Sequence, residues 1–246
     1  MRVHLGATGA DEATELAIAH ALVRRAGAGE VAEAIRLYRP TAPAVVFGRR
    51  DTRLPGFPGA LRAAVAAGYR PAVRAVGGRA VAYTTNTLIV DHVRHEPNAG
   101  ARLEDRFVAY GALIASALRE LGIDARVGEV PGEFCPGAHS VNARGVAKIV
   151  GTAQRVVRDA WLFSTLVTVD DDRELRPLLE DVYGHLGLPF DPASVGSVRA
   201  EAPHVDLAQV ELGLLRAHGV EPASAVDLDE PTIALAKELV GEHDLR

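Results

Sequence analysis

Cysteine and lysine are almost missing from this sequence, which has one cysteine, Cys135, and two lysines, Lys148 and Lys237, in 246 residues. A single cysteine excludes an internal disulfide, and the absence of C-x-x-C and H-E-x-x-H spacings argues against a zinc site. The nine histidines are scattered, and the closest pair, His92 and His95, is weak support for a metal. We therefore expect neither a disulfide nor a bound metal.

Long apolar runs and basic runs are missing as well. No segment approaches the about 20 apolar residues of a membrane-spanning helix, and the first ten residues, MRVHLGATGA, lack the apolar core of a signal peptide. The net charge is -5, with both signs interspersed, which argues against non-specific binding of nucleic acid. We expect a cytoplasmic protein that binds neither membranes nor nucleic acid.

The remaining composition is that of a globular protein, with 48% hydrophobic and 24% charged residues. Apolar spacing predicts helices over 11–25, 59–68 and 103–121. Short β-branched or aromatic runs are typical of strands, and they lie at 34–39, 44–48, 72–76, 79–83, 87–93 and 160–169, with further strand character within 132–155. Hairpin-joined strands beside a few long helices favour an α+β fold, with a mixed, partly antiparallel sheet flanked by helices.

The pattern becomes helical from position 170 onward, with helices predicted within 178–187, 206–219 and 227–241. The segment 186–203 is rich in Pro, Gly and Ser, which predicts a loop or subdomain boundary. A chain of this length forms one large domain, or one domain with a small appendage. We expect a single catalytic domain over 1–246, in which 171–246 forms a helical lid or subdomain.

Two adjacent glycines, Gly77 and Gly78, separate the strand-like runs VRAV and RAVAY. The ordinary interpretation of such a pair is a hairpin turn with φ above zero at both positions. The functional interpretation is that missing side chains let backbone N–H groups approach a carbonyl or phosphate closely. Arg74 and Arg79 flank the pair, so the turn could also hold an anion or a polarised carbonyl.

Cys135 lies in the sequence GEFCPGAHS, and a lone cysteine is more often a small buried hydrophobe than a nucleophile. Its neighbours favour a reactive role. Pro136 disfavours a helical conformation at Cys135 and predicts an extended one, and Pro136-Gly137 suits the centre of a turn. The thiol is then expected at the lip of a turn. His139, four residues on, leaves a Cys–His pair open as an alternative, although no flanking sequence resembles a Cys–His protease.

Lys148 stands out because the other basic residues, apart from Lys237, are 25 arginines. Biased codon composition explains Lys237, which fits a solvent-facing helix position in IALAKELV. Lys148 lies among apolar residues in GVAKIVG, so we expect it to be half-buried, with its amine pKa lowered by desolvation. Such an amine could take the proton of Cys135, or donate to an acyl carbonyl. The pair can meet only if residues 135–140 fold back over the sheet.

Three segments together resemble the superfamily of lipoate–protein ligases and octanoyltransferases: LYRPTAPAVVFGRRD, VRAVGGRAVAY and AKIVGTAQRVVRDAWLFSTLVTVD. The match covers most of residues 11–172 in the right order. Within it, R-x-x-G-G-R-A-V is similar to the family's acyl-cradle signature, and K-x-x-G-x-A-Q-R is similar to its lysine-strand motif. The resemblance implies a fold shared with biotin ligases and class II tRNA-synthetase cores.

Within the superfamily, GEFCPG resembles the cysteine loop of transferases that work through an acyl-thioester, whereas ATP-dependent ligases typically have an Asn-Asp pair there. The resemblance implies Cys135 as nucleophile and Lys148 as the residue that activates it or orients the carbonyl. It also implies a set of residues around the acyl chain and its carbonyl, namely Arg74, Gly77, Gly78, Arg79, Ala80, Tyr83, Gly151 and Gln154.

The reaction so implied moves an octanoyl or lipoyl group onto a lysine of a lipoyl-carrier domain, without a tightly bound cofactor. The donor would be an acyl carrier protein or another carrier, such as the glycine-cleavage H protein. An ATP-dependent lipoate–protein ligase, which would use ATP and Mg through lipoyl-adenylate, is the alternative. A biotin ligase is disfavoured because its G-R-G-R-x-G loop is absent.

An inactive carrier-binding paralogue is a further alternative, because the sequence departs from the family pattern at several positions. Val76 replaces a common Ser or Thr, Tyr83 replaces a common His, and LFST over 162–165 replaces the ligase-like H-H-G-T.

Overall fold

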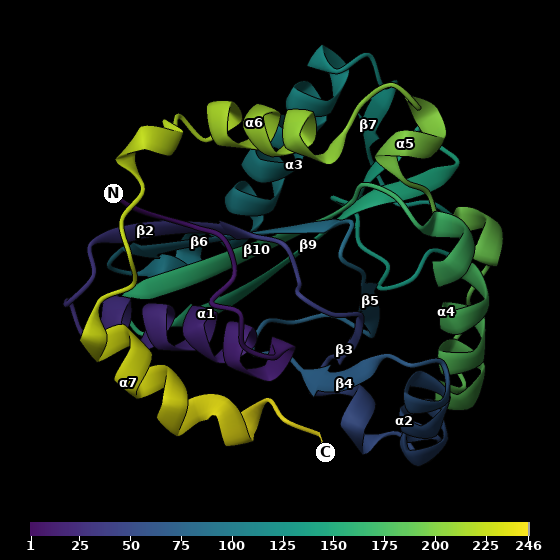
Figure 1. The fold of residues 1–246 in the computed structure, drawn as a ribbon, viewed down its shortest axis with the longest axis horizontal. Helices are drawn as coiled ribbons and strands as arrows, with labels where there is room; N and C mark the ends of the chain where they lie inside the picture. Colours follow the sequence, from purple (N-terminus) through teal and green to yellow (C-terminus); the bar gives the residue numbers. More distant parts are fainter. Residues whose placement is uncertain (246) are drawn as a thin grey trace.

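A seven-stranded mixed sheet forms the centre of the computed structural model, which describes residues 1–245 (Figure 1). The strands in spatial order are β1 (Arg2–Leu5), β2 (Glu33–Tyr38), β6 (Thr87–His95), β10 (Ala160–Thr168), β9 (Ala147–Val157), β8 (Val141–Ala143) and β7 (Ala125–Val127). Strands β1 and β2 are parallel, and every other neighbouring pair in this sheet is antiparallel. The predicted α+β class with a mixed, partly antiparallel sheet is confirmed.

A smaller sheet of three strands lies beside the first, in the order β4 (Arg70–Val73), β3 (Ala44–Phe47) and β5 (Val81–Tyr83). Strand β3 pairs in parallel with β4 and antiparallel with β5. The hairpin predicted between the two runs that flank Gly77-Gly78 is therefore wrong, because β3 lies between β4 and β5 and the two never pair. The connection is a seven-residue loop over 74–80, which we call the glycine loop.

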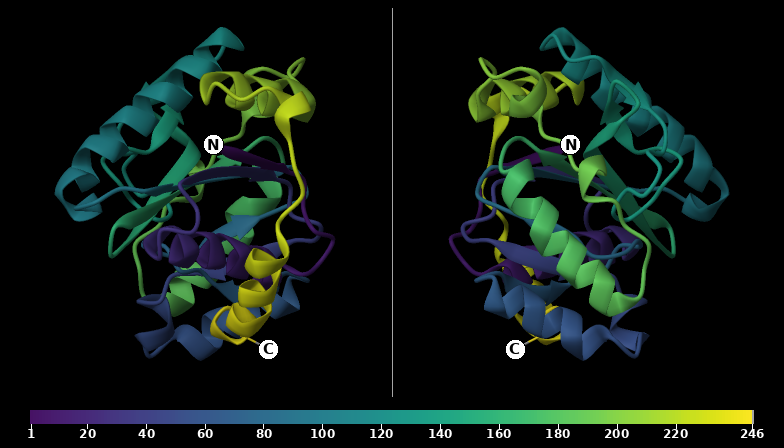
Figure 2. Two further views of the ribbon diagram at one scale, coloured as in Figure 1. Left: turned by 90° about the vertical axis from the view of Figure 1, so that its left-hand side faces the viewer. Right: turned by 90° about the vertical axis from the view of Figure 1, so that its right-hand side faces the viewer.

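Helices cover both faces of the large sheet (Figures 1 and 2). Helix α1 (Glu12–Gly27) lies on one face, and its apolar residues pack with those of α7 (Glu230–Leu239). Helix α3 (Leu103–Glu120) covers the other face and is itself covered by α6 (Leu207–Ala217). Beside the small sheet, α2 (Phe57–Ala66) packs against α4 (Asp172–Leu186). The short α5 (Val198–Glu201) lies between α4 and α6 in the chain.

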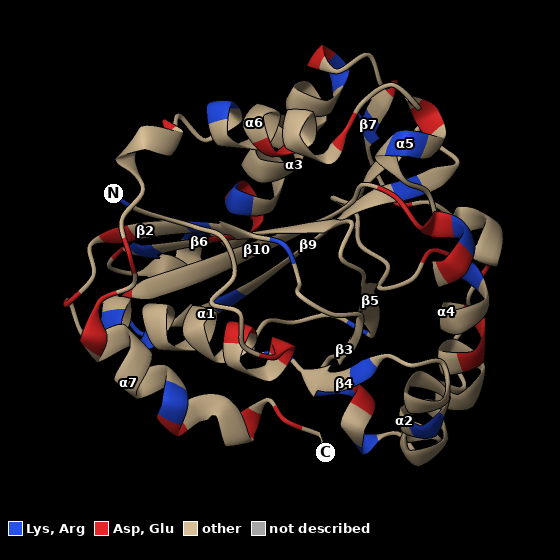
Figure 3. Ribbon diagram, viewed as in Figure 1, with Lys and Arg blue, Asp and Glu red and all other residues tan. Residues whose placement is uncertain are grey.

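The helical character predicted for the C-terminal third is confirmed, and its helices lie at three different places on the molecule (Figure 1). Helix α4 starts at Asp172 and contains Pro177, earlier than the start predicted after the proline. No helix within residues 1–245 is long and apolar enough to cross a membrane. Acidic and basic residues are interspersed along the helices in the view of Figure 3, as predicted.

A buried polar network lies between α1 and the large sheet. Arg36 on β2 pairs with Glu15 of α1, and the Tyr38 hydroxyl donates to the Glu12 carboxyl at 3.1 Å. Burial raises the pKa of Glu12 to about 8. The folded state therefore keeps a proton on Glu12 that the unfolded chain loses above its ordinary pKa of 4.5.

This proton has a measurable consequence for stability. As pH rises from about 4.5 to 8, the free energy of unfolding should fall, because folding must hold Glu12 protonated or bury its charge. Glutamine has nearly the shape of a protonated glutamate but does not titrate. We therefore expect the free energy of unfolding of Glu12→Gln, relative to that of the wild type, to rise by a few kcal/mol between pH 5 and 9. Urea unfolding at several pH values checks this, and parallel curves for the two proteins would contradict it.

Candidate active site

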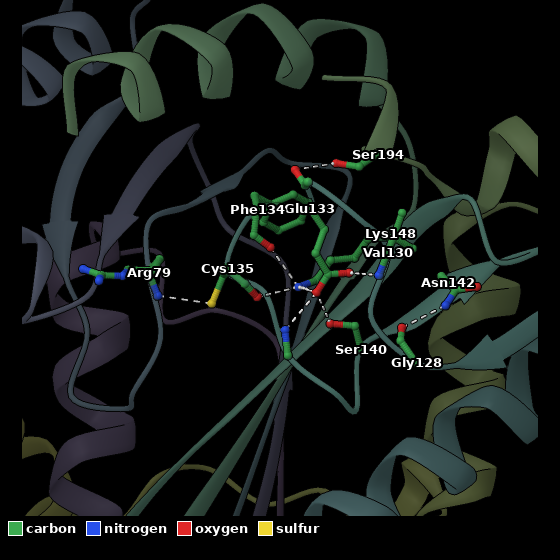
Figure 4. A network of polar contacts seen from close by, with 12 residues as sticks. Arg79, Gly128, Val130, Glu133, Phe134, Cys135, Ser140, Asn142, Lys148 and Ser194 are labelled. Carbon is green, nitrogen blue, oxygen red and sulfur yellow. Dashed lines mark hydrogen bonds and ion pairs between the residues drawn. The ribbon is translucent and has the colours of Figure 1, made fainter. Parts of the chain in front are cut away.

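Cys135 lies in the loop between β7 and β8, and this loop folds back so that the thiol meets the glycine loop (Figure 4). The sulfur accepts a hydrogen bond from the backbone N–H of Arg79 at 3.2 Å. The backbone carbonyl of Cys135 accepts from Lys148 Nζ at 2.8 Å. The fold thus brings the cysteine, the lysine and Gly77-Gly78 to one place, as the sequence required for a site.

The backbone of Cys135 is not extended, and that prediction is wrong. Its φ is 44°, in the left-handed region, which is strained for a residue with a side chain and more so before proline. Tertiary contacts impose this conformation, because the Cys135 N–H donates to the Tyr183 hydroxyl at 2.6 Å while its carbonyl is held by Lys148. The turn also lies later than predicted, over 137–140, closed by the Ser140 N–H donating to the Gly137 carbonyl.

Lys148 is fully buried, with only 1% of its surface exposed, so the half-buried position predicted for it is wrong. It projects from β9, opposite Asn142 on β8 across the hairpin, beside a β-bulge that shifts the register between Val141 and Asn142. Its amine donates to Glu133 Oε1 at 3.1 Å and to the carbonyls of Phe134 and Cys135 at 2.9 and 2.8 Å. Three acceptors match the three N–H donors of an ammonium group.

Glu133 organises this loop, and it was not among the residues predicted from the sequence. Its Oε1 atom accepts from Lys148, from the Ser140 hydroxyl at 2.6 Å and from the Gly137 N–H at 3.0 Å, and its Oε2 atom accepts from the Val130 N–H (Figure 4). The carboxylate is buried and its charge is compensated by the lysine. Nothing in GEFCPG distinguishes a buried glutamate from an exposed one, so no sequence signal was available.

The glycine loop supplies the donors to the sulfur. The buried Arg74 guanidinium lies 3.6 Å from the sulfur and braces the loop from within by donating to the carbonyls of Gly77 and Arg79. The Arg79 side chain turns away to Asp51, and only its backbone N–H faces the thiol. These donors converge on the sulfur, which is the nucleophilic atom of a reactive cysteine.

Gly78 is the point of closest approach between the two loops. Its φ is 99°, and a Cβ atom there would lie 2.6 Å from the Cys135 sulfur and 2.6 Å from an Arg74 nitrogen. Gly77 has no positive φ, which corrects the expectation of two such residues, and a Cβ there would meet only the Gln154 carbonyl, at 3.9 Å. Only Gly78 is therefore sterically required.

Two cavities meet at Cys135. The first, which we call the slot, is narrow and mostly apolar, has a volume of about 30 Å³ and is lined by Arg74, Val76, Val81, Tyr83, Cys135, Gly151, Thr152, Ala153, Ser164 and Leu166. The second, the vestibule, has a volume of about 240 Å³ and is lined by Gly77, Gly78, Phe107, residues 135–140, Thr152, Ala153 and Gln154. The thiol thus lies at the inner end of an accessible cavity and at the mouth of an apolar one.

The predicted substrate-binding residues are divided among these places. Arg74, Tyr83 and Gly151 line the slot, whereas the two paired glycines and Gln154 line the vestibule. Ala80 lines neither cavity, and its carbonyl accepts a hydrogen bond from the Tyr183 hydroxyl at 2.9 Å.

Tyr183 of α4 ties the two loops together, and sequence reasoning missed it. Burial raises the pKa of its hydroxyl, which stays protonated, donates to the Ala80 carbonyl and accepts from the Cys135 N–H. In the sequence, Tyr183 lies on the apolar face of an amphipathic helix, 48 residues from the cysteine, and nothing there distinguishes it from a core residue. The C-terminal helices therefore supply a structural part of the site.

The arrangement suits covalent acyl chemistry. A cysteine with two donors at its sulfur can act as nucleophile, and here it lies between a narrow, mostly apolar cavity and a wider one. Within residues 1–245, no group of three or more His, Cys, Asp or Glu residues is placed to hold a metal ion.

Comparison with known proteins places this chain in a family. Residues 11–218 match the lipoyl protein ligase A/B catalytic domain. The chain is 32% identical over 177 residues to an octanoyl-[GcvH]:protein N-octanoyltransferase of Geobacillus kaustophilus, covering 72% of this chain and 62% of the relative. A protein of the same name from an Exiguobacterium species is 29% identical over 140 residues, covering 56% of this chain and 49% of the relative. The chain thus spans about half to three fifths of the length of these relatives.

Solved structures show the same fold. Lipoate-protein ligase A bound with ATP superposes with a TM-score of 0.77 at 22% identity, over 98% of this chain and 95% of the other. A putative lipoate protein ligase of T. acidophilum with bound lipoic acid gives a TM-score of 0.72 at 22% identity, with the same coverage. The match over 11–218 includes the glycine loop, Cys135 and Lys148. The chain belongs to the family of the lipoyl protein ligase A/B catalytic domain.

Proposed function

We propose that this protein transfers an octanoyl or lipoyl group onto a lysine of a lipoyl-carrier domain through a thioester on Cys135, without ATP. The observation that carries the proposal is the position of the thiol, at the junction of slot and vestibule and within reach of two donors of the glycine loop. The relatives are named for transfer from octanoyl-GcvH to a protein. This name supports a carrier protein as donor and a second protein as acceptor.

In the first half-reaction the Cys135 thiolate attacks the acyl carbonyl of the donor. A carbon–sulfur bond forms and the bond between the acyl carbon and the donor breaks. A thioester donor leaves as a thiolate, and an amide donor leaves as an amine that takes up the proton released by the Cys135 thiol. The Arg74 guanidinium and the Arg79 N–H hold the sulfur in place for the attack, and the apolar chain enters the slot. A cavity of about 30 Å³ holds roughly one water, so the chain must displace side chains that line it.

Lys148 has a positioning role in this scheme. Its amine contacts Cys135 through the backbone carbonyl, and its three protons are all donated to oxygen atoms. We propose that it fixes the strained loop conformation that turns the sulfur toward the glycine loop. The residues of 1–246 act together as one catalytic domain, because α4 holds Cys135 through Tyr183 while α6 and α7 pack on α3 and α1.

A transfer assay tests the function. Octanoyl-GcvH and an octanoyl acyl carrier protein are offered separately with an apo lipoyl-carrier domain, in the absence of ATP, and the carrier lysine is followed by mass spectrometry. We expect an acylated carrier with at least one donor, and octanoyl-GcvH is the one that the relatives favour. Modification that requires ATP and free lipoate would instead favour the ligase alternative, and carrier binding without any transfer would favour an inactive paralogue.

A further inference from the structure

The vestibule in front of Cys135 contains a second ionisable side chain. Among its lining residues, His139 is the one with a basic side chain. His139 lies in the turn 137–140, which Glu133 anchors at both ends through the Gly137 N–H and the Ser140 hydroxyl. The loop that positions the nucleophile therefore also positions this imidazole.

The imidazole is oriented by helix α3. Its Nε2 atom lies 2.7 Å from Glu104 Oε1, and its ring stacks on Phe107 with 5.7 Å between ring centres and 10° between the ring planes. The charged group in contact with it is Glu104, and Cys135 is the titratable group that shares its cavity. With Nε2 held by the carboxylate, Nδ1 is the nitrogen that remains to accept a proton, and it has no partner within residues 1–245.

His139 is not paired with the thiol. The sulfur has its hydrogen-bond donors in Arg74 and Arg79, and no hydrogen bond joins it to the imidazole in the part of the chain that the structure describes. The Cys–His pair left open by the sequence is thus not formed. The imidazole faces instead the cavity through which a second reactant must come, because the acyl chain occupies the slot.

The second half-reaction needs a base at this place. An acceptor lysine has a pKa of about 10.4 in water and arrives protonated, so it cannot attack until it loses a proton. Lys148 cannot take that proton, since each of its N–H groups is donated and no lone pair is free.

We propose that His139, oriented by Glu104, is the general base that deprotonates the acceptor lysine. This role rests on the proposed thioester mechanism. The lysine nitrogen forms a bond to the acyl carbon, the bond from that carbon to the Cys135 sulfur breaks, and the sulfur leaves as a thiolate. The proton from nitrogen goes to His139 Nδ1 and then to solvent.

The two half-reactions are measured separately in wild type, His139→Gln and Glu104→Gln. Acylation of Cys135 by octanoyl acyl carrier protein, a thioester donor whose leaving thiolate needs no proton, is followed by intact mass, and single-turnover transfer from acyl-enzyme to a saturating carrier domain is followed at pH 6 to 9. In His139→Gln we expect acylation within about threefold of wild type and transfer slowed at least about 100-fold, the range of general base catalysis. The dependence of the transfer rate on pH should differ between wild type and His139→Gln. The transfer rate of Glu104→Gln should lie between those of wild type and His139→Gln.

Two controls separate this role from a structural one. His204 is exposed and does not line the vestibule, so His204→Gln should transfer like wild type. Hydroxylamine is neutral at pH 7 and needs no base, so it should remove the acyl group from His139→Gln as fast as from wild type. Wild-type transfer by His139→Gln, or equal loss of both half-reactions, overturns the base assignment while the thioester stands. Absence of an acyl adduct in wild type overturns the thioester and this assignment together.

Discussion

Gly78→Ala is expected to abolish acyl transfer, because the added methyl group would occupy the space of the reactive sulfur. The new Cβ would lie 2.6 Å from the Cys135 sulfur and 2.6 Å from an Arg74 nitrogen. In addition, alanine at a φ of 99° is strained by about 1–2 kcal/mol. Either the thiol or the arginine must move, and the donors that hold the sulfur in place are lost with that movement. We expect the rate of adduct formation to fall more than about 100-fold, as for an interaction of about 3 kcal/mol.

The matched control is the same change one residue earlier. Gly77→Ala adds its methyl group where the nearest atom is the Gln154 carbonyl at 3.9 Å, without a positive φ. The rate at which iodoacetamide alkylates Cys135 reports the reactivity of the thiol, and thermal unfolding shows whether each variant is folded. Gly78→Ala should lose far more alkylation rate than Gly77→Ala. Equal rates in the two folded variants would show that the close approach of the glycine loop has no role at the thiol.

Lys148→Met is expected to be the most destabilising single change at the site. It leaves the Glu133 carboxylate buried without its counter-charge, and breaking a buried pair costs about 3–5 kcal/mol of the free energy of unfolding. Adding Glu133→Gln removes the uncompensated charge, so the double variant should recover part of this loss. Urea unfolding of the two single variants and the double variant gives the coupling energy.

Lys237 provides the control for this cycle, because it lies exposed on α7. Lys237→Met should change the free energy of unfolding by no more than about 0.5 kcal/mol. Additive effects of the two changes at Lys148 and Glu133 would contradict the buried pair as the element that holds the cysteine loop.

The long elements could be predicted from sequence because their periodicity is local. The helix expected over 103–121 is α3, and the runs at 87–93 and 160–169 are β6 and β10. Strands β1 and β7, of four and three residues, are too short for alternation to be visible. The glycine loop was interpreted as a hairpin because its flanking strands are adjacent in the chain. Their shared partner β3 comes earlier in the sequence, and local pattern cannot show that insertion.

The candidate site divides in the same way. Cys135, Lys148 and the glycine loop carry unusual residues or motifs, whereas Glu133 and Tyr183 are ordinary residue types that matter only through where the fold buries them. The reason for a lysine at 148 also changes with the structure. The sequence favoured an amine with an adjustable pKa, but the structure shows a compact donor with three converging acceptors. A planar guanidinium with five donors does not match that geometry.

The thioester on Cys135 is the central claim, and intact mass spectrometry of the protein tests it most directly. The protein is incubated with an octanoyl donor, without ATP and without an acceptor, and its mass is compared with that of Cys135→Ala, which can form neither a thioester nor an ester. The account predicts one added octanoyl group on the wild type, removable by hydroxylamine, and none on the variant. The account would be contradicted if the wild type stays unmodified with a donor that does acylate the carrier lysine once the carrier domain is added.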